Sequence, residues 1–174
     1  MDYVLFGAVA LWTAILGWQD WRHRRLPNLL TLGGAGAALM WKLAGGGLPE
    51  FGNALAGGLL AGAFFLIPFL LKGAGGGDVK MLFAAGCIVG LGRPLLLLLW
   101  YASLMGLILG LTMLAAGRLD GARLKHYVRT LFDWRYDRQA GAANLPPKEA
   151  EKVRVPFGLA IGSGLLLVLA LPPH

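Results

Sequence analysis

The 174-residue chain is 57% hydrophobic and only 14% charged, a composition that excludes an ordinary water-soluble globular domain. Its net charge of +7 does not indicate nucleic-acid binding, because the basic residues flank apolar segments and lie in no RNA- or DNA-binding motif. We therefore expect the basic residues to bind anionic membrane lipid, and we expect no nucleic-acid partner.

Long apolar segments predict an all-α, polytopic membrane protein with about six transmembrane helices. The expected helices, in chain order, are 3–18, 28–43, 53–71, 79–91, 94–116 and 155–171. The fourth would reach only about 20 Å, against a hydrocarbon core of about 30 Å. We expect this helix to begin below the membrane surface.

The basic residues predict an orientation. Of the 16 Lys and Arg residues, all but Lys42 and Arg93 fall in the segments 18–27, 72–80 and 117–154. The positive-inside rule places these three segments in the cytoplasm and both termini outside. Charged and apolar residues alternate in the segment 117–154, which we expect to form an amphipathic helix on anionic lipid of the inner leaflet, ending at Pro146 and Pro147.

Two of the nine acidic residues, Asp20 and Asp78, adjoin the cytoplasmic ends of predicted spans. Ionisable groups at such positions are functional candidates. Taken singly, Asp20 is equally well explained as a solvated acid near three arginines. Asp78 is the stronger candidate, although it could serve only as the N-cap of the fourth helix. Taken together, two carboxylates sharing one proton can hydrolyse a peptide bond: the ionised one activates water and the protonated one donates to the scissile carbonyl.

Helix ends suggest a role for each acid. We expect Asp20 to follow the C-terminus of the first helix, where the dipole disfavours negative charge, and Asp78 to precede the fourth helix. On this hypothesis Asp78 is the base and Asp20 the acid, although nearby arginines act in the opposite direction on Asp20. The glycines Gly75, Gly76 and Gly77 would let the backbone approach an extended substrate.

Three motifs occur in order along nearly the whole chain: Asp20 with a following Arg25-Leu26-Pro27-Asn28, then Gly75-Gly76-Gly77-Asp78-Val79-Lys80, then Pro156-Phe157-Gly158. The sequence thereby resembles the type IV prepilin peptidase and preflagellin peptidase family, the GxGD aspartyl peptidases of prokaryotic cytoplasmic membranes. The resemblance implies a single peptidase domain over 1–174 with Asp20 and Asp78 as the catalytic pair. It also implies site-shaping roles for Gly75, Gly76, Gly77, Pro27, Asn28 and Lys80, the last orienting a carboxylate.

The resemblance further implies a prepilin-like substrate, whose short basic leader is removed after a glycine on the cytoplasmic side, without metal or cofactor. Bifunctional relatives carry an added N-terminal region with paired cysteines that accompanies N-methylation. This chain begins at the first catalytic-domain helix and has one cysteine, Cys87, so we expect a stand-alone peptidase.

Two other functions compete. A small transporter or structural subunit of an export machine could use Asp20 and Asp78 as ion ligands, but it would need them near the membrane midplane. A serine peptidase could use Ser163, yet the histidines fall at the outer terminus or in cytoplasmic segments, and helix packing through small residues explains the serine better.

Overall fold

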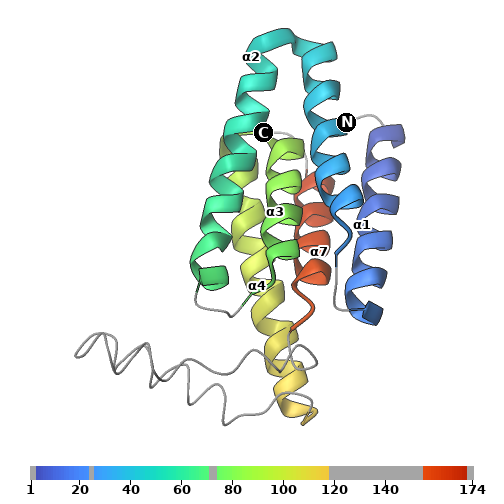
Figure 1. Ribbon diagram of the computed structural model, residues 1–174, viewed down its shortest axis with the longest axis vertical. Helices are drawn as coiled ribbons and strands as arrows, with labels where there is room; N and C mark the ends of the chain where they lie inside the picture. The colour runs from blue at the N-terminus through green and yellow to red at the C-terminus, as the bar shows by residue number, and fades with distance from the viewer. Residues whose placement is uncertain (1–2, 24–25, 71–73, 118–154, 172–174) are drawn as a thin grey trace, which may run out of the picture. The chain divides into compact units, whose positions relative to one another are not determined.

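The computed structural model describes residues 3–23, 26–70, 74–117 and 155–171, and within these ranges every regular element is a helix. The all-α class is thereby confirmed. The helices are α1 (Tyr3–His23), α2 (Asn28–Leu70), α3 (Gly76–Val89), α4 (Arg93–Ala115) and α7 (Phe157–Ala170) (Figure 1). The helix predicted within 117–154 lies outside the described residues.

Helix α2 is a hairpin of two antiparallel arms (Figure 1). The arms meet at Gly47, whose φ of 67° and ψ of −158° are non-helical. Glycine suits this position because a Cβ makes positive φ costly. Pro49 follows at the start of the second arm, where its missing N–H leaves no helical hydrogen bond unmade. The arms correspond to the second and third predicted helices.

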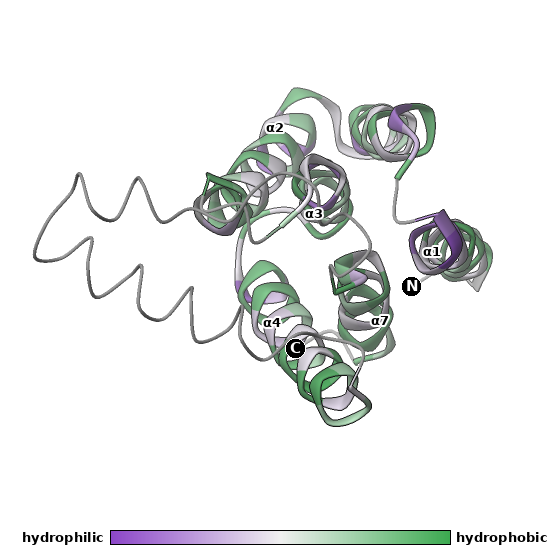
Figure 2. Cartoon of the chain, turned by 60° about the horizontal axis from the view of Figure 1, so that its bottom comes forward, coloured by the Kyte–Doolittle hydropathy of each residue, from purple (hydrophilic) through white to green (hydrophobic). Residues whose placement is uncertain are grey.

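Two described helices, α2 and α4, are long and apolar enough to cross a membrane, whereas α7 is apolar but only 14 residues long. In Figure 2 hydrophobic residues recur along every helix, and hydrophilic residues mark the C-terminal end of α1. These two helices favour the predicted membrane protein. That six helical segments all cross the bilayer stays a prediction.

Contacts divide the chain into two units, one comprising Met1–Leu109 and Pro156–His174, the other Gly110–Val155. In the second unit the structure describes the last turns of α4 and Val155. In the first unit, α3 packs chiefly on α2, and α7 packs on both α1 and α3. Its largest fully buried apolar side chains come from four helices: Leu16, Met81, Leu82, Leu98, Ile161 and Leu165.

Glycines bring α2 and α3 into backbone contact. A Cβ added at Gly86 of α3 would lie 2.6 Å from the Gly57 carbonyl oxygen and 2.9 Å from the Gly58 Cα, both on α2. Such close approach favours helix association in a membrane, where dispersion forces replace the hydrophobic effect. At the end of α3, Asn53 of α2 accepts a hydrogen bond from the Leu91 N–H (2.9 Å) and holds the turn into α4.

We predict that Gly86→Ala destabilises the protein by about 1–3 kcal/mol, because main-chain atoms of α2 must move to admit the methyl group. Thermal unfolding in detergent, followed by circular dichroism, measures the effect. Gly52→Ala is the matched control, since a Cβ there meets nothing within 4 Å. Equal melting temperatures for Gly86→Ala and wild type would contradict this account of the interface.

Candidate active site

Four helix ends lie together at one end of the first unit: the C-terminus of α1 and the N-termini of α2, α3 and α7 (Figure 1). Three of these helices meet at Gly162 of α7, where a Cβ would lie 3.3 Å from the Thr13 Cβ on α1 and 3.7 Å from the Met81 Cε on α3. From this contact, Asp20 and Asp78 lie one to two helical turns farther toward that same end. The structure thus places both aspartates at one end of one helix cluster.

Asp20 is buried, with 6% of its surface exposed, and its Oδ2 accepts a hydrogen bond of 2.7 Å from the Gly158 N–H. The expectation that Asp20 follows the first helix is wrong, because α1 continues from Trp18 to His23 and includes it. The exposed residues Arg22 and His23 still belong to the helix, beyond its apolar part. Burial and a long-range hydrogen bond also argue against a merely solvated acid.

Gly158 can make this hydrogen bond because it has no side chain. A Cβ at this position would lie 2.8 Å from Asp20 Oδ2 and 3.1 Å from Asp20 Cγ. The preceding residue, Phe157, packs edge-on against Phe65 of α2, with ring centroids 5.4 Å apart. Its ring also lies where a side chain at Gly106 of α4 would be. Phe157 therefore fixes the start of α7, and with it the amide that Asp20 uses.

Asp78 is also buried, with 7% of its surface exposed. The expectation that it precedes a helix beginning at Val79 is wrong: α3 begins at Gly76, Gly75 is the N-cap, and Asp78 lies in the first turn. Its Oδ2 accepts a hydrogen bond of 2.9 Å from the Gly75 N–H. Asp78 thus supports the helix start, as an acid at this capping position commonly does, while its carboxylate stays at the site.

The two carboxylates share one kind of hydrogen-bond donor. Each accepts a main-chain N–H at a helix N-terminus, Asp78 at α3 and Asp20 at α7. Positive partial charge at a helix N-terminus stabilises an anion. The hypothesis that Asp78 is the base and Asp20 the acid considered only α1 and α3, and the α7 N-terminus removes much of the asymmetry on which it rested.

Other predicted site residues form direct contacts around the two aspartates. Lys80 of α3 donates a hydrogen bond of 2.7 Å to Asn28 Oδ1, so its partner is the amide at the start of α2. A Cβ at Gly77 would lie 2.9 Å from the Leu26 Cβ, so that segment packs closely there. The Pro27 carbonyl oxygen accepts hydrogen bonds from the Leu30 and Thr31 N–H groups at the start of α2. A Cβ at Gly76 would make only an ordinary contact, 3.4 Å from Phe69.

Within the described ranges, no group of three or more His, Cys, Asp or Glu residues is arranged to hold a metal ion. The Ser163 hydroxyl donates to the Ala160 carbonyl oxygen (3.0 Å), a bond that serine commonly makes inside a helix. Its place within α7 fits helix packing. Asp20 and Asp78 are buried, and carboxyl groups can act as a general acid and a general base.

Sequence reasoning missed the roles of Phe157 and Gly158. The motif Pro156-Phe157-Gly158 was visible, but the contact it makes joins residues 138 positions apart. The one local signal was a glycine in the first turn of an apolar helix, next to an aromatic residue. That pattern permits a close approach to the helix N-terminus without identifying the acceptor.

Comparison with known proteins adds an independent finding. A family model described as the Type IV leader peptidase family matches residues 7–111, more than half of the chain, and this range includes Asp20 and Asp78. No curated protein and no solved structure matches. The family is one of aspartic-type peptidases, in agreement with a site built from two buried acids, and the chain belongs to the Type IV leader peptidase family.

Proposed function

We propose that this protein is a prepilin leader peptidase. It cleaves the short basic leader of a type IV pilin-like, pseudopilin-like or archaellin-like precursor at the cytoplasmic face of a prokaryotic cytoplasmic membrane. The observation that carries the proposal is the burial of Asp20 and Asp78 at one end of a membrane-protein helix cluster, each held by a main-chain N–H. Family membership supports the general activity.

The proposed reaction needs one proton shared between Asp20 and Asp78. The ionised carboxylate removes a proton from water, which attacks the scissile carbonyl carbon. The protonated carboxylic acid donates to the carbonyl oxygen as it gains negative charge. The tetrahedral intermediate then collapses: its hydroxyl returns a proton to the second aspartate as the carbonyl re-forms, the peptide C–N bond breaks, and the amine leaves with the proton held by the first aspartic acid. Either aspartate suits either role, because both accept a helix N-terminal amide.

The surrounding segments suit an extended peptide. Gly75 and Gly76 have no side chains to obstruct a substrate backbone beside Asp78. At Gly77 the place of a side chain is taken by Leu26. The hydrogen bond between Lys80 and Asn28 joins the starts of α3 and α2 at the exposed side of this region. A substrate helix leaving the membrane would have to unwind its leader to reach the two buried acids. The aspartates lie at the helix ends, which does not favour the ion-transport alternative, since a transport site belongs near the midplane.

We predict that Asp20→Asn and Asp78→Asn each reduce leader cleavage by at least about 100-fold, because either change removes the acid or the base. The measurement is the rate of prepilin processing by purified enzyme in detergent, followed on gels. Ser163→Ala is the control for α7 and for the serine-peptidase alternative, and it should cleave at the wild-type rate.

An Asp20→Asn enzyme that keeps both limbs of the pH–rate profile would refute the two-acid mechanism. Intact prepilin with the wild type and both variants would instead favour the transporter, and ion flux through reconstituted vesicles would then be the decisive measurement.

We predict that Gly158→Ala lowers the cleavage rate roughly 10- to 100-fold, because the methyl group must displace the Asp20 carboxylate or the start of α7. Gly36→Ala is the matched control, since a Cβ there meets nothing within 4 Å. Comparing rates with melting temperatures separates a misplaced carboxylate from general unfolding. A folded Gly158→Ala enzyme with wild-type activity would show that the contact between Gly158 and Asp20 has no part in catalysis.

A further inference from the structure

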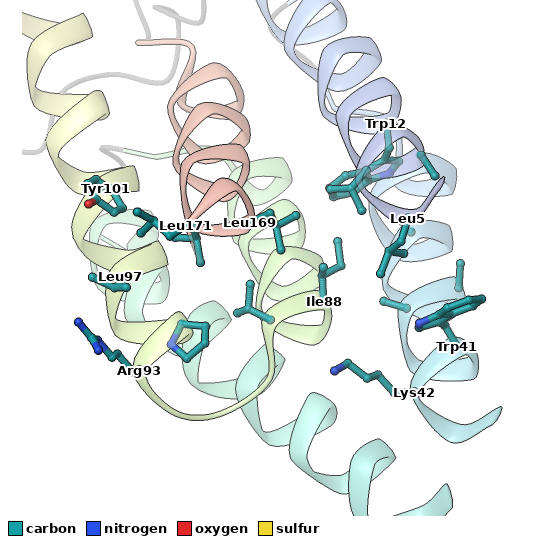
Figure 3. Close-up of a pocket in the computed structure, with 18 residues that line it drawn as sticks. Leu5, Trp12, Trp41, Lys42, Ile88, Arg93, Leu97, Tyr101, Leu169 and Leu171 are labelled. Atoms are coloured by element: carbon teal, nitrogen blue, oxygen red, sulfur yellow. The ribbon is translucent and has the colours of Figure 1, made fainter. Parts of the chain in front are cut away.

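The first unit contains a cavity of about 940 Å³ at the end opposite Asp20 and Asp78. Its walls come from α1, the first arm of α2, the end of α3, the start of α4 and the end of α7 (Figure 3). Most lining side chains are apolar, among them Leu5, Trp12, Trp41, Ile88, Leu97 and Leu169. This apolar cavity has no place in the proposed peptide cleavage.

Two cations lie at one end of this apolar space. Lys42 and Arg93 both line the cavity and lie on opposite sides of it, and the guanidinium of Arg93 points away from Lys42 (Figure 3). These are the two basic residues, out of 16, that the sequence places on the side away from the cytoplasm. Lys42 interacts weakly with Glu50 (3.5 Å), whereas no described carboxylate lies within ion-pair distance of Arg93. The cavity therefore combines apolar walls with a positively charged rim.

We propose that this cavity binds one anionic phospholipid, with its acyl chains against the apolar walls and its headgroup at the end where Lys42 and Arg93 lie. A membrane surrounds the protein with molecules of this polarity, and an anionic headgroup complements the two cations. The site is separate from the inner-leaflet lipid contact predicted for residues 117–154.

The binding energy has two sources that can be tested separately. Acyl chains pack against the lining, so a bulky side chain inside the cavity should exclude them. The positive charges of Lys42 and Arg93 attract an anionic headgroup, so neutral amides at these positions should weaken the binding of an anionic lipid more than that of a zwitterionic one. Ala38, partly buried and in the lining, is the position for the bulky residue. Ala63, exposed on the second arm of α2 and outside the lining, is its matched control.

Native mass spectrometry of the full chain, titrated with phosphatidylglycerol and with phosphatidylcholine of the same chains, measures the binding. We expect one tightly held phosphatidylglycerol on wild type and on Ala63→Phe, and its loss from Ala38→Phe. The double variant Lys42→Gln/Arg93→Gln should bind phosphatidylglycerol about tenfold or more weakly, with a smaller change for phosphatidylcholine. Because both cations lie at the rim, this double variant carries the test if Ala38→Phe fails to fold.

Unchanged phosphatidylglycerol binding by the folded Ala38→Phe and by the double variant would overturn the proposal. So would a folded Ala38→Phe that retains its lipid but has a raised KM for prepilin, since the cavity would then take substrate. Equal weakening of both lipids in the double variant would overturn the assignment of an anionic headgroup.

Discussion

A carboxylate taken out of water needs hydrogen-bond donors, and this requirement governs the arrangement of the site. Asp20 and Asp78 are both buried, and each takes a donor from the first residues at a helix start, where main-chain N–H groups have no partner within the helix. Asp78 uses the helix that carries it, whereas Asp20 needs a helix from the far end of the chain. The docking of α7 against α1 is therefore a condition for the site to exist.

Docking this close depends on residues without side chains. Gly158 admits Asp20, Gly86 admits the backbone of α2, and a Cβ at Gly164 of α7 would lie 2.8 Å from the Ala102 nitrogen of α4. Membrane helices gain little from the hydrophobic effect when they associate, so backbone contact through small residues supplies much of the attraction. Glycines thus allow close helix packing, and this packing brings a main-chain donor to the buried carboxylate of Asp20.

The sequence predicted the helical class and the places of the helices well, because long apolar segments are a strong signal. It predicted helix ends poorly. Trp18 is the predicted end of α1, but the helix continues through the buried Asp20 to His23. Val79 is the predicted start of α3, but the glycines before it are already helical or capping. Asp20 and Asp78 were identified from their positions at span ends, whereas the hydrogen bond from Gly158 joins distant parts of the chain and has no local pattern.

The hydrogen-bond donor to Asp20 is a main-chain N–H, that of Gly158. Every residue except proline has a main-chain N–H, so proline is the one substitution at position 158 that deletes the donor. Other side chains there would keep the donor but crowd the carboxylate of Asp20. What can remove it is a shift of α7 as a rigid body, which would lengthen a 2.7 Å bond without altering any residue of the site. Mutations far along α7, or at the contact between Phe157 and Phe65, would then abolish peptide cleavage while leaving both aspartates in place.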